Sequence, residues 1–421
     1  MKKVFGSALV VAACLMAGAC GKSVGLSSID IAVQAVMFRL SPHSATNWGG
    51  YGGYAAFVDA GGNAALLETT AMDVGTVSWT NYGIFFSDTE FDYLIRTDGA
   101  NLVQVSPKTD YQDGLVHLGE GRWAGAYNHG ISEDGYDTQV IVTSAAGASR
   151  GRAFNWYPLL GGCSGELFGI TERYTDDERG ESVLSQLYSP SDGIAEIELA
   201  GMAAIFNNTG LGNASAPCQQ SELVFLATTY LYPHEDELVY LLHEAAKFSG
   251  CAVNYSGFNR GCITVQRWNV NTGALSVAAL VSENMSGDFL FSSDHNGRYN
   301  HSTLVGDELI WIHNEGKVLA SDIYTGATRM ISEGLGGGFI DVFPYVVENE
   351  LWLAKTSLYK NRAGFHQVEV AVIDLESGNF IGDTRMLEFR TPNSADNIIR
   401  GFAINPDAAV RDAFLGREVA S

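Results

Sequence analysis

Apolar and polar residues alternate along most of the chain, and the alternation recurs in a unit of about fifty residues. Three segments share the form Asp/Asn-x-x-Thr/Ser-Gly and end at Gly273, Gly326 and Gly378, spaced 53 and 52 residues apart. An alternating run precedes each segment and another follows it. This is the pattern of a β-hairpin, in which Asp or Asn opens the turn and Gly accepts a positive φ. The spacing therefore predicts repeated copies of one β unit.

Weaker copies of the turn extend this repeat toward the N-terminus. They lie near Gly61, Gly99, Gly147 and Gly193, which brings the number of predicted turns to seven. The 80 residues from Gly193 to Gly273 contain three of the four cysteines that follow residue 20, so we expect one repeat to carry an insertion there. Between the turns lies a second hairpin unit whose second strand carries Trp, as in residues 118–123, 305–311 and 347–352. Two hairpins per repeat make four antiparallel strands, the content of one propeller blade.

These patterns predict an all-β fold, a single β-propeller of seven four-stranded blades over residues 29–410, followed by a C-terminal tail at 411–421. The segment before Gly61 supplies only outer strands, whereas residues 398–404 form a strand with no hairpin after it. Pairing of this last strand with the first ones would complete the seventh blade. The alternative is two packed β-sandwich domains, whose strands recur every 8–12 residues without such a superperiod.

One repeat unit, from Gly316 to Gly326, resembles the repeat of quinoprotein-type propellers. These include quinone-dependent dehydrogenases and the lipoprotein that assists outer-membrane barrel assembly. The match is good in one repeat and partial in two. It implies a fold and no catalytic residue, because many unrelated functions share that fold.

The first twenty residues have the features of an export signal. Lys2 and Lys3 precede sixteen uncharged residues, which is short of the roughly 20 that span a bilayer, and small residues precede Cys20. We therefore expect a signal peptide at 1–19. A Cys directly after small residues resembles the lipobox of bacterial lipoproteins, although Ala17 stands where Leu is usual. The resemblance implies lipidation of Cys20, a lipid-anchored tether at 20–28 and an extracytoplasmic location at the cell envelope.

Counting cysteines helps to choose between two candidate lipidation sites. Cys14 fits the lipobox consensus better, but it leaves a shorter apolar region and an odd number of thiols in the exported chain. Lipidation of Cys20 leaves an even number, suited to an oxidising compartment: Cys163, Cys218, Cys251 and Cys262. Of the three possible pairings we prefer Cys163 with Cys218 and Cys251 with Cys262, because the latter two bracket a short loop.

The chain is strongly acidic, with 25 basic and 48 acidic residues and a net charge of −23. Nucleic-acid binding is not expected, because phosphate contacts depend on Lys and Arg. The negative charge favours solubility and would suit a cationic or metal-bearing partner.

Polar side chains directly precede the expected innermost strands of several blades. If the register is right, they surround one mouth of the channel, and His129 begins a further loop; the other candidates are Asp73, Asp113, Asn300, His301, Asp341 and Asp396. Carboxylates at this place would suit Ca²⁺ or a cationic or polyhydroxyl ligand, and no other cofactor is expected. Alternatively, each Asp merely caps its own loop through local amides.

Two functions remain open from the sequence. The first is a non-catalytic propeller that binds an envelope protein or glycan. The second is a glycan-active enzyme, a glycoside hydrolase or lyase, with two carboxyl groups at the channel mouth. We prefer the binding module, because the sequence contains no distinctive catalytic signature. Two carboxylates facing each other in a deep, aromatic-lined pocket would favour the enzyme.

Overall fold

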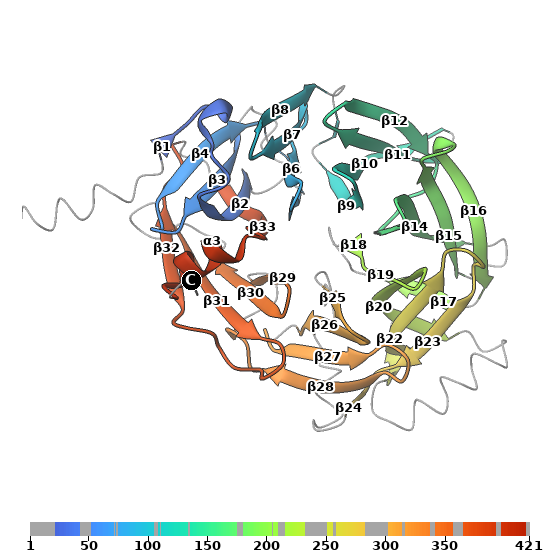
Figure 1. The fold of residues 1–421 in the computed structure, drawn as a ribbon. Helices are drawn as coiled ribbons and strands as arrows, with labels where there is room; N and C mark the ends of the chain where they lie inside the picture. Colours follow the sequence, from blue (N-terminus) through green and yellow to red (C-terminus); the bar gives the residue numbers. More distant parts are fainter. Residues whose placement is uncertain are drawn as a thin grey trace, which may run out of the picture.

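Seven antiparallel sheets follow one another around a central axis in the computed structural model (Figure 1). The structure describes residues 22–42, 52–70, 72, 75–104, 108–109, 111–133, 135–174, 180–203, 205–208, 215–231, 251–255, 258–282, 302–313, 316–336, 342–356, 365–392 and 397–417. The predicted all-β propeller with seven blades is confirmed, and two packed sandwiches do not describe it.

Each blade contains four strands in chain order from the axis outward, except the first. Blade one consists of β33 (Asn397–Ile404), β2 (Gln34–Pro42), β3 (Gly53–Asp59) and β4 (Ala64–Thr69). Blade two consists of β5 (Val77–Thr80), β6 (Gly83–Ser87), β7 (Phe91–Arg96) and β8 (Gly99–Gln104). Blade three consists of β9 (Gln112–Gly119), β10 (Arg122–Ser132), β11 (Gly135–Ser144) and β12 (Gly147–Ala153).

The remaining blades repeat this order. Blade four consists of β13 (Leu159–Cys163), β14 (Glu166–Tyr174), β15 (Gly180–Ser189) and β16 (Gly193–Ala203). Blade five consists of β19 (Cys218–Gln219), β20 (Glu222–Leu231), β22 (Phe258–Asn269) and β23 (Leu275–Ala279). Blade six consists of β25 (Thr303–Val305), β26 (Glu308–Ile312), β27 (Val318–Asp322) and β28 (Ala327–Ser332). Blade seven consists of β29 (Val342–Val347), β30 (Glu350–Thr356), β31 (His366–Asp374) and β32 (Arg385–Phe389).

Blade five carries the additional strands of the expected insertion. β17 (Ile205–Asn208) pairs with β20, and β21 (Cys251–Tyr255) pairs with β22. Two further short strands pair in parallel with neighbouring blades: β18 (Ser215–Ala216) with β13, and β24 (Val281–Ser282) with β28.

The ring closes through the two ends of the chain, as expected. The last strand, β33, pairs antiparallel with β2, so that Phe402 lies opposite Phe38. Helix α3 (Ala408–Leu415) follows and is capped by the Asp407 side chain, which accepts a hydrogen bond from the Ala409 amide. The predicted start of a C-terminal tail at residue 411 falls inside this helix. Its Phe414 is buried 6.0 Å from the ring of Trp352, so the helix is packed on the propeller.

The repeated turns have the geometry that their sequence predicts. Asp322 Oδ1 accepts hydrogen bonds from the amides of Tyr324 (3.0 Å) and Thr325 (2.7 Å). The Gly326 amide donates to the Asp322 carbonyl, and Gly326 has a φ of 71°. Asn269 and Asp374 open their turns in the same way, because a short side-chain acceptor satisfies amides that the turn leaves unpaired.

The apolar core lies between adjacent blades. One cluster of buried side chains runs from blade four through blade six and includes Trp268 and Trp311. Trp123, Trp311 and Trp352, which the sequence units place on second strands, are fully buried on β10, β26 and β30. Within the described ranges, no helix has the length and apolar character needed to cross a membrane.

One predicted disulfide is confirmed. Cys163 at the end of β13 is bonded to Cys218 at the start of β19, with the Cα atoms 5.5 Å apart, and the bond joins blades four and five. The backbone of Cys251 lies opposite Cys262 on antiparallel β21 and β22, but their bond stays a prediction. Cys20 and the predicted signal peptide lie outside the described residues.

Candidate functional site

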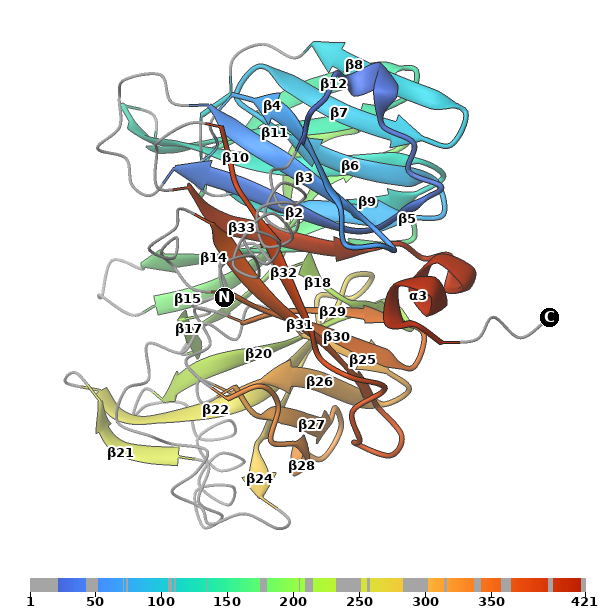
Figure 2. The same ribbon diagram turned by 90° about the vertical axis from the view of Figure 1, so that its left-hand side faces the viewer.

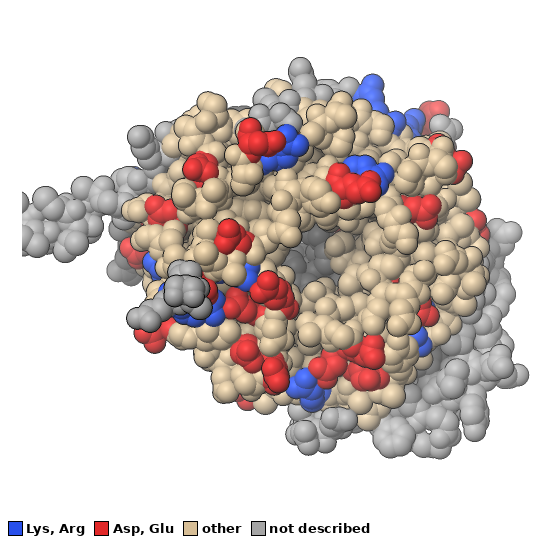
Figure 3. All heavy atoms as spheres, in the orientation of Figure 1, with Lys and Arg blue, Asp and Glu red and all other residues tan. Residues whose placement is uncertain are grey.

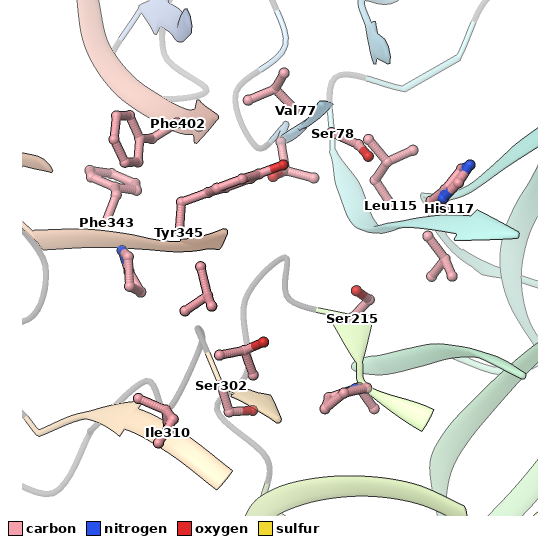
Figure 4. Close-up of a pocket in the computed structure, with 18 of the residues that line it drawn as sticks. Val77, Ser78, Leu115, His117, Ser215, Ser302, Ile310, Phe343, Tyr345 and Phe402 are labelled. Carbon is pink, nitrogen blue, oxygen red and sulfur yellow. The ribbon is translucent and has the colours of Figure 1, made fainter. Parts of the chain in front are cut away.

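The centre of the ring is hollow, and the space-filling view shows the opening among scattered acidic side chains (Figure 3). Inside lies a cavity of about 380 Å³ lined by innermost strands of several blades. Its wall combines polar side chains with apolar and aromatic ones (Figure 4); the apolar and aromatic side chains include Val77, Leu115, Ile310, Phe343, Tyr345 and Phe402. A cavity of this size and character is suited to a small ligand or to one protruding side chain of a partner.

Tyr345 reaches across the channel from blade seven to blade two (Figure 4). Its hydroxyl donates to the Trp79 carbonyl at 2.7 Å and accepts from the Trp79 amide at 3.3 Å. Burial raises the pKa of Tyr345 to about 12, although the hydrogen bond with Trp79 opposes this. The side chain is therefore neutral, and it connects blades seven and two at the cavity wall.

His117 supplies a second polar group to the wall. It lies opposite Trp123 on the β9–β10 ladder, and the two ring centroids are 5.0 Å apart. Burial lowers the pKa of His117, which favours the neutral imidazole. Its Nε2 atom is buried and has no hydrogen-bond partner in the described part of the chain. A ligand in the cavity could supply that partner.

The remaining polar groups on the wall are the Arg400 guanidinium and several hydroxyl groups. Ser78, Ser215 and Ser302 lie on the wall, and Ser78 accepts a hydrogen bond from the Trp123 indole at 3.2 Å. None of the described lining residues is Asp or Glu. The arrangement can bind an apolar group and fix its orientation through a few hydrogen bonds, but these residues do not provide a pair of acids.

Asp113 is the one predicted acidic ligand that the structure describes. It lies near the start of β9, is 6% exposed and does not belong to the cavity wall. Burial raises its pKa to about 7, and hydrogen bonds from Trp156 and Asn128 oppose the rise. The Trp156 indole donates to Asp113 Oδ1 at 3.2 Å, whereas Oδ2 is buried and has no hydrogen-bond partner among the described residues. Side chains from other segments thus hold this carboxyl group.

The other predicted site residues are only partly placed. His129 lies within β10 and is exposed, so it does not begin a loop as predicted. The ring of side chains at the channel mouth stays a prediction, because its other members lie outside the described residues: Asp73, Asn300, His301, Asp341 and Asp396. Within the described ranges, no group of three His, Cys, Asp or Glu residues could hold a metal ion. The Ca²⁺ expectation depends on the undescribed carboxylates and stays untested.

A buried ionic network that the sequence did not predict lies between blades two and three. Lys108 Nζ lies 2.6 Å from Asp92 Oδ1, and the two side chains are 0% and 1% exposed. Asp92 also accepts from Ser87 Oγ at 2.7 Å and from Thr143 Oγ1 at 2.5 Å. Burial lowers the pKa of Lys108, and Asp92 opposes this shift. These groups are fully enclosed, so their role is to join blades.

Arg39 extends the same kind of contact to blade one. It is fully buried, and its guanidinium donates to the Thr69 hydroxyl at 2.8 Å and to the carbonyls of Tyr54 and Ser87. Burial lowers its pKa to about 10, although nearby Asp88 raises it. The sequence did not predict this network, because isolated charged residues in an alternating strand do not indicate it.

Comparison with known proteins adds little beyond the fold. No family model and no curated protein matches the sequence. Among solved structures, a variant of apocarotenoid oxygenase from Synechocystis is 9% identical over 90% of this chain and 94% of its own, with a TM-score of 0.45. BamB from Moraxella catarrhalis is 10% identical over 75% and 85%, with a TM-score of 0.35. The Swd1 β-propeller domain of Myceliophteria thermophila is 10% identical over 75% of this chain and 86% of its own, with a TM-score of 0.37. At these values the likenesses carry no argument about activity.

Proposed function

We propose that this protein is an exported, lipid-anchored β-propeller that binds a partner at the cell envelope without catalysing a reaction on it. The observation that carries the proposal is the central cavity, whose described wall combines apolar side chains with hydroxyl groups, the Arg400 guanidinium and a neutral imidazole. Such a surface suits binding by apolar contact with a few orienting hydrogen bonds.

The absence of acids from the described wall supports binding over glycoside chemistry. Glycoside hydrolysis by the common mechanisms uses two carboxyl groups about 5–9 Å apart. Asp113 lies outside the cavity wall, and its nearest described partners are Trp156 and Asn128. No observation at the cavity therefore favours the enzyme.

The envelope location is supported by the cysteines and by the N-terminal sequence. Disulfides persist in oxidising compartments, and the bond from Cys163 to Cys218 joins two blades. The small residues before Cys20 are typical of a lipidation signal.

A cavity-filling variant tests the binding proposal. The mature domain without its lipid would be immobilised and exposed to solubilised envelope proteins and to a glycan array. Ser215→Phe should abolish retention of the captured partner, because the larger ring occupies the cavity. Met330→Phe on the outer strand β28 is the matched control and should retain it. Retention unaffected by Ser215→Phe would contradict binding in the cavity, and turnover of glycosides would contradict a non-catalytic role.

The anchor is tested separately. Cys20→Ser should release the protein from the membrane fraction, and the mass of the wild-type mature N-terminus should include the lipid on Cys20. A lipid found on Cys14 would contradict the assignment.

A further inference from the structure

The segment that follows the proposed lipidation site is part of blade one. β1 (Lys22–Ser23) pairs in parallel with β4, with Lys22 opposite Ala65, and the Val24 amide donates to the Leu66 carbonyl at 2.9 Å. The 3₁₀ helix η1 (Leu26–Ser28) follows. Leu26 and Ile29 pack against the apolar cluster shared by blades one and two. The predicted tether at 20–28 is therefore attached to the propeller from Lys22 onward.

This attachment limits how far the propeller can lie from a lipid on Cys20. Two residues of extended chain reach at most about 7 Å between the Cα atoms of Cys20 and Lys22. The polar zone on each side of a bilayer is about 5–7 Å thick. The backbone at Lys22 must then lie close to the membrane surface. Lipidation at Cys14 would instead allow about 28 Å of separation.

The chain enters β1 at the rim where blade one meets blade seven. Because β1 runs parallel to β4, Lys22 lies at the end of β4 that follows the turn of Asp59 to Asn63. Arg385 on β32 donates to the Ala60 carbonyl in this turn at 2.9 Å. Figure 1 shows β1, β4 and β32 on the same side of the ring, and Figure 2 views the molecule from that side.

Two of the segments that meet the turn of Asp59 to Asn63 carry an exposed apolar side chain. Met386 on β32 is 59% exposed, and Val33 between η1 and β2 is 52% exposed. Glu68 and Glu388 are also exposed on β4 and β32, so the rim is not a deeply inserting surface. Contact with lipid would be shallow and would be maintained by the covalent anchor.

We infer that the rim formed by β1, β4 and β32 faces the lipid bilayer, with both mouths of the channel open sideways to the envelope space. This orientation rests on the proposed lipidation of Cys20. It follows from the short chain between Cys20 and the parallel β1–β4 pairing, and the exposed apolar side chains on the segments that meet the turn of Asp59 to Asn63 suit a lipid surface.

Photo-crosslinking tests the orientation. The full lipidated chain would be reconstituted into vesicles of phosphatidylethanolamine and phosphatidylglycerol that contain a lipid with a photoactivatable headgroup. Crosslinks should be about tenfold enriched around Val33 and Met386 over Ile131, which is 84% exposed on the far blade three. Twelve Gly and Ser residues inserted after Gly21 form the matched control, because they lengthen the tether by about 20 Å outside the folded part.

The insertion should reduce the enrichment to about twofold or less, since a longer flexible tether lowers the effective concentration of the rim at the membrane. Equal enrichment with and without the insertion, or crosslinks concentrated on Ile131, would overturn the orientation. The intact mass of the same preparation separates the two proposals. A chain without lipid on Cys20 contradicts the anchor itself, whereas a lipidated chain with evenly spread crosslinks contradicts only the orientation.

Discussion

Two carboxyl groups, one buried and one half-buried, make the stability of this protein depend on pH. Burial raises the pKa of Asp113 to about 7 and that of Glu172 to about 8. The folded state therefore favours the protonated acid, whereas the unfolded chain titrates near pH 4. The stability that this pKa difference contributes is fully present below about pH 4, where the carboxyl group is protonated even in the unfolded chain. It is lost as the pH rises through the pKa of the folded state.

We predict that Asp113→Asn makes the free energy of unfolding less dependent on pH between 5 and 8. Relative to the variant, the wild type should lose about 2–4 kcal/mol over this range, since one pKa unit corresponds to about 1.4 kcal/mol. Urea unfolding at several pH values measures this difference. Glu172→Gln is the control. It should also make the free energy of unfolding less dependent on pH, with the midpoint of the change displaced toward pH 8. Parallel pH curves for wild type and Asp113→Asn would contradict the burial argument.

The enclosed ion pair leads to a second expectation at this scale. Lys108→Met leaves the Asp92 carboxylate buried without its cation and should cost about 3–5 kcal/mol of unfolding free energy. The double variant with Asp92→Asn should recover part of that loss. Arg329→Met breaks the exposed pair with Glu308 and should cost less than about 1 kcal/mol. Similar losses at both positions, measured by denaturant titration, would show that burial does not determine the cost.

At the scale of single elements, the repeated turns differ in how much space surrounds their glycines. Gly326 and Gly193 have φ values of 71° and 76°. A Cβ on Gly326 would lie 2.0 Å from the Ala279 carbonyl oxygen, whereas a Cβ on Gly193 would have no atom within 4 Å.

Gly193→Ala should therefore cost about 1–2 kcal/mol, the conformational penalty alone. Gly326→Ala should cost clearly more, because the backbone of blade five or six must also move. Thermal unfolding of the two variants against wild type provides the comparison. Equal decreases in Tm would contradict the role assigned to the neighbouring carbonyl.

The turns could be predicted from sequence because their interactions are local. Asp322 and Gly326 lie four residues apart and determine the turn geometry together. The two-residue strand β1 has no such pattern, and only its pairing with β4 defines it. Likewise, Asp92 binds Lys108 from its own blade and Thr143 from the next one, so no short window of sequence indicates these contacts.

At the scale of the whole molecule, the spacing of the repeats predicted seven blades and the pairing of the two chain ends. It could not predict the cavity, because the wall combines residues from distant blades. Tyr345 and Trp79, which meet there, are 266 residues apart. Asp113 was expected directly before an innermost strand but is the second residue of β9, and its burial beside Trp156 depends on the loop that leads to the next blade.

The disulfide between blades four and five should stabilise the ring as a whole. Replacing Cys163 and Cys218 together by Ser should reduce the free energy of unfolding by about 2–4 kcal/mol.

Thiol titration of the denatured mature domain should find no free thiol, and Cys251→Ser should expose one, that of Cys262. Two free thiols in the wild type would contradict the second predicted bond.

The pairing of β33 with β2 also determines when the molecule can finish folding. The strand that completes blade one is synthesised after all the other blades, while its partner is among the first strands. Until residues 397–404 arrive, β2 presents an unpaired edge beside an incomplete ring, and such edges invite aggregation. Contacts of such long sequence separation form slowly. Any chain interrupted before β33 should therefore be degraded by proteases rather than form a smaller propeller.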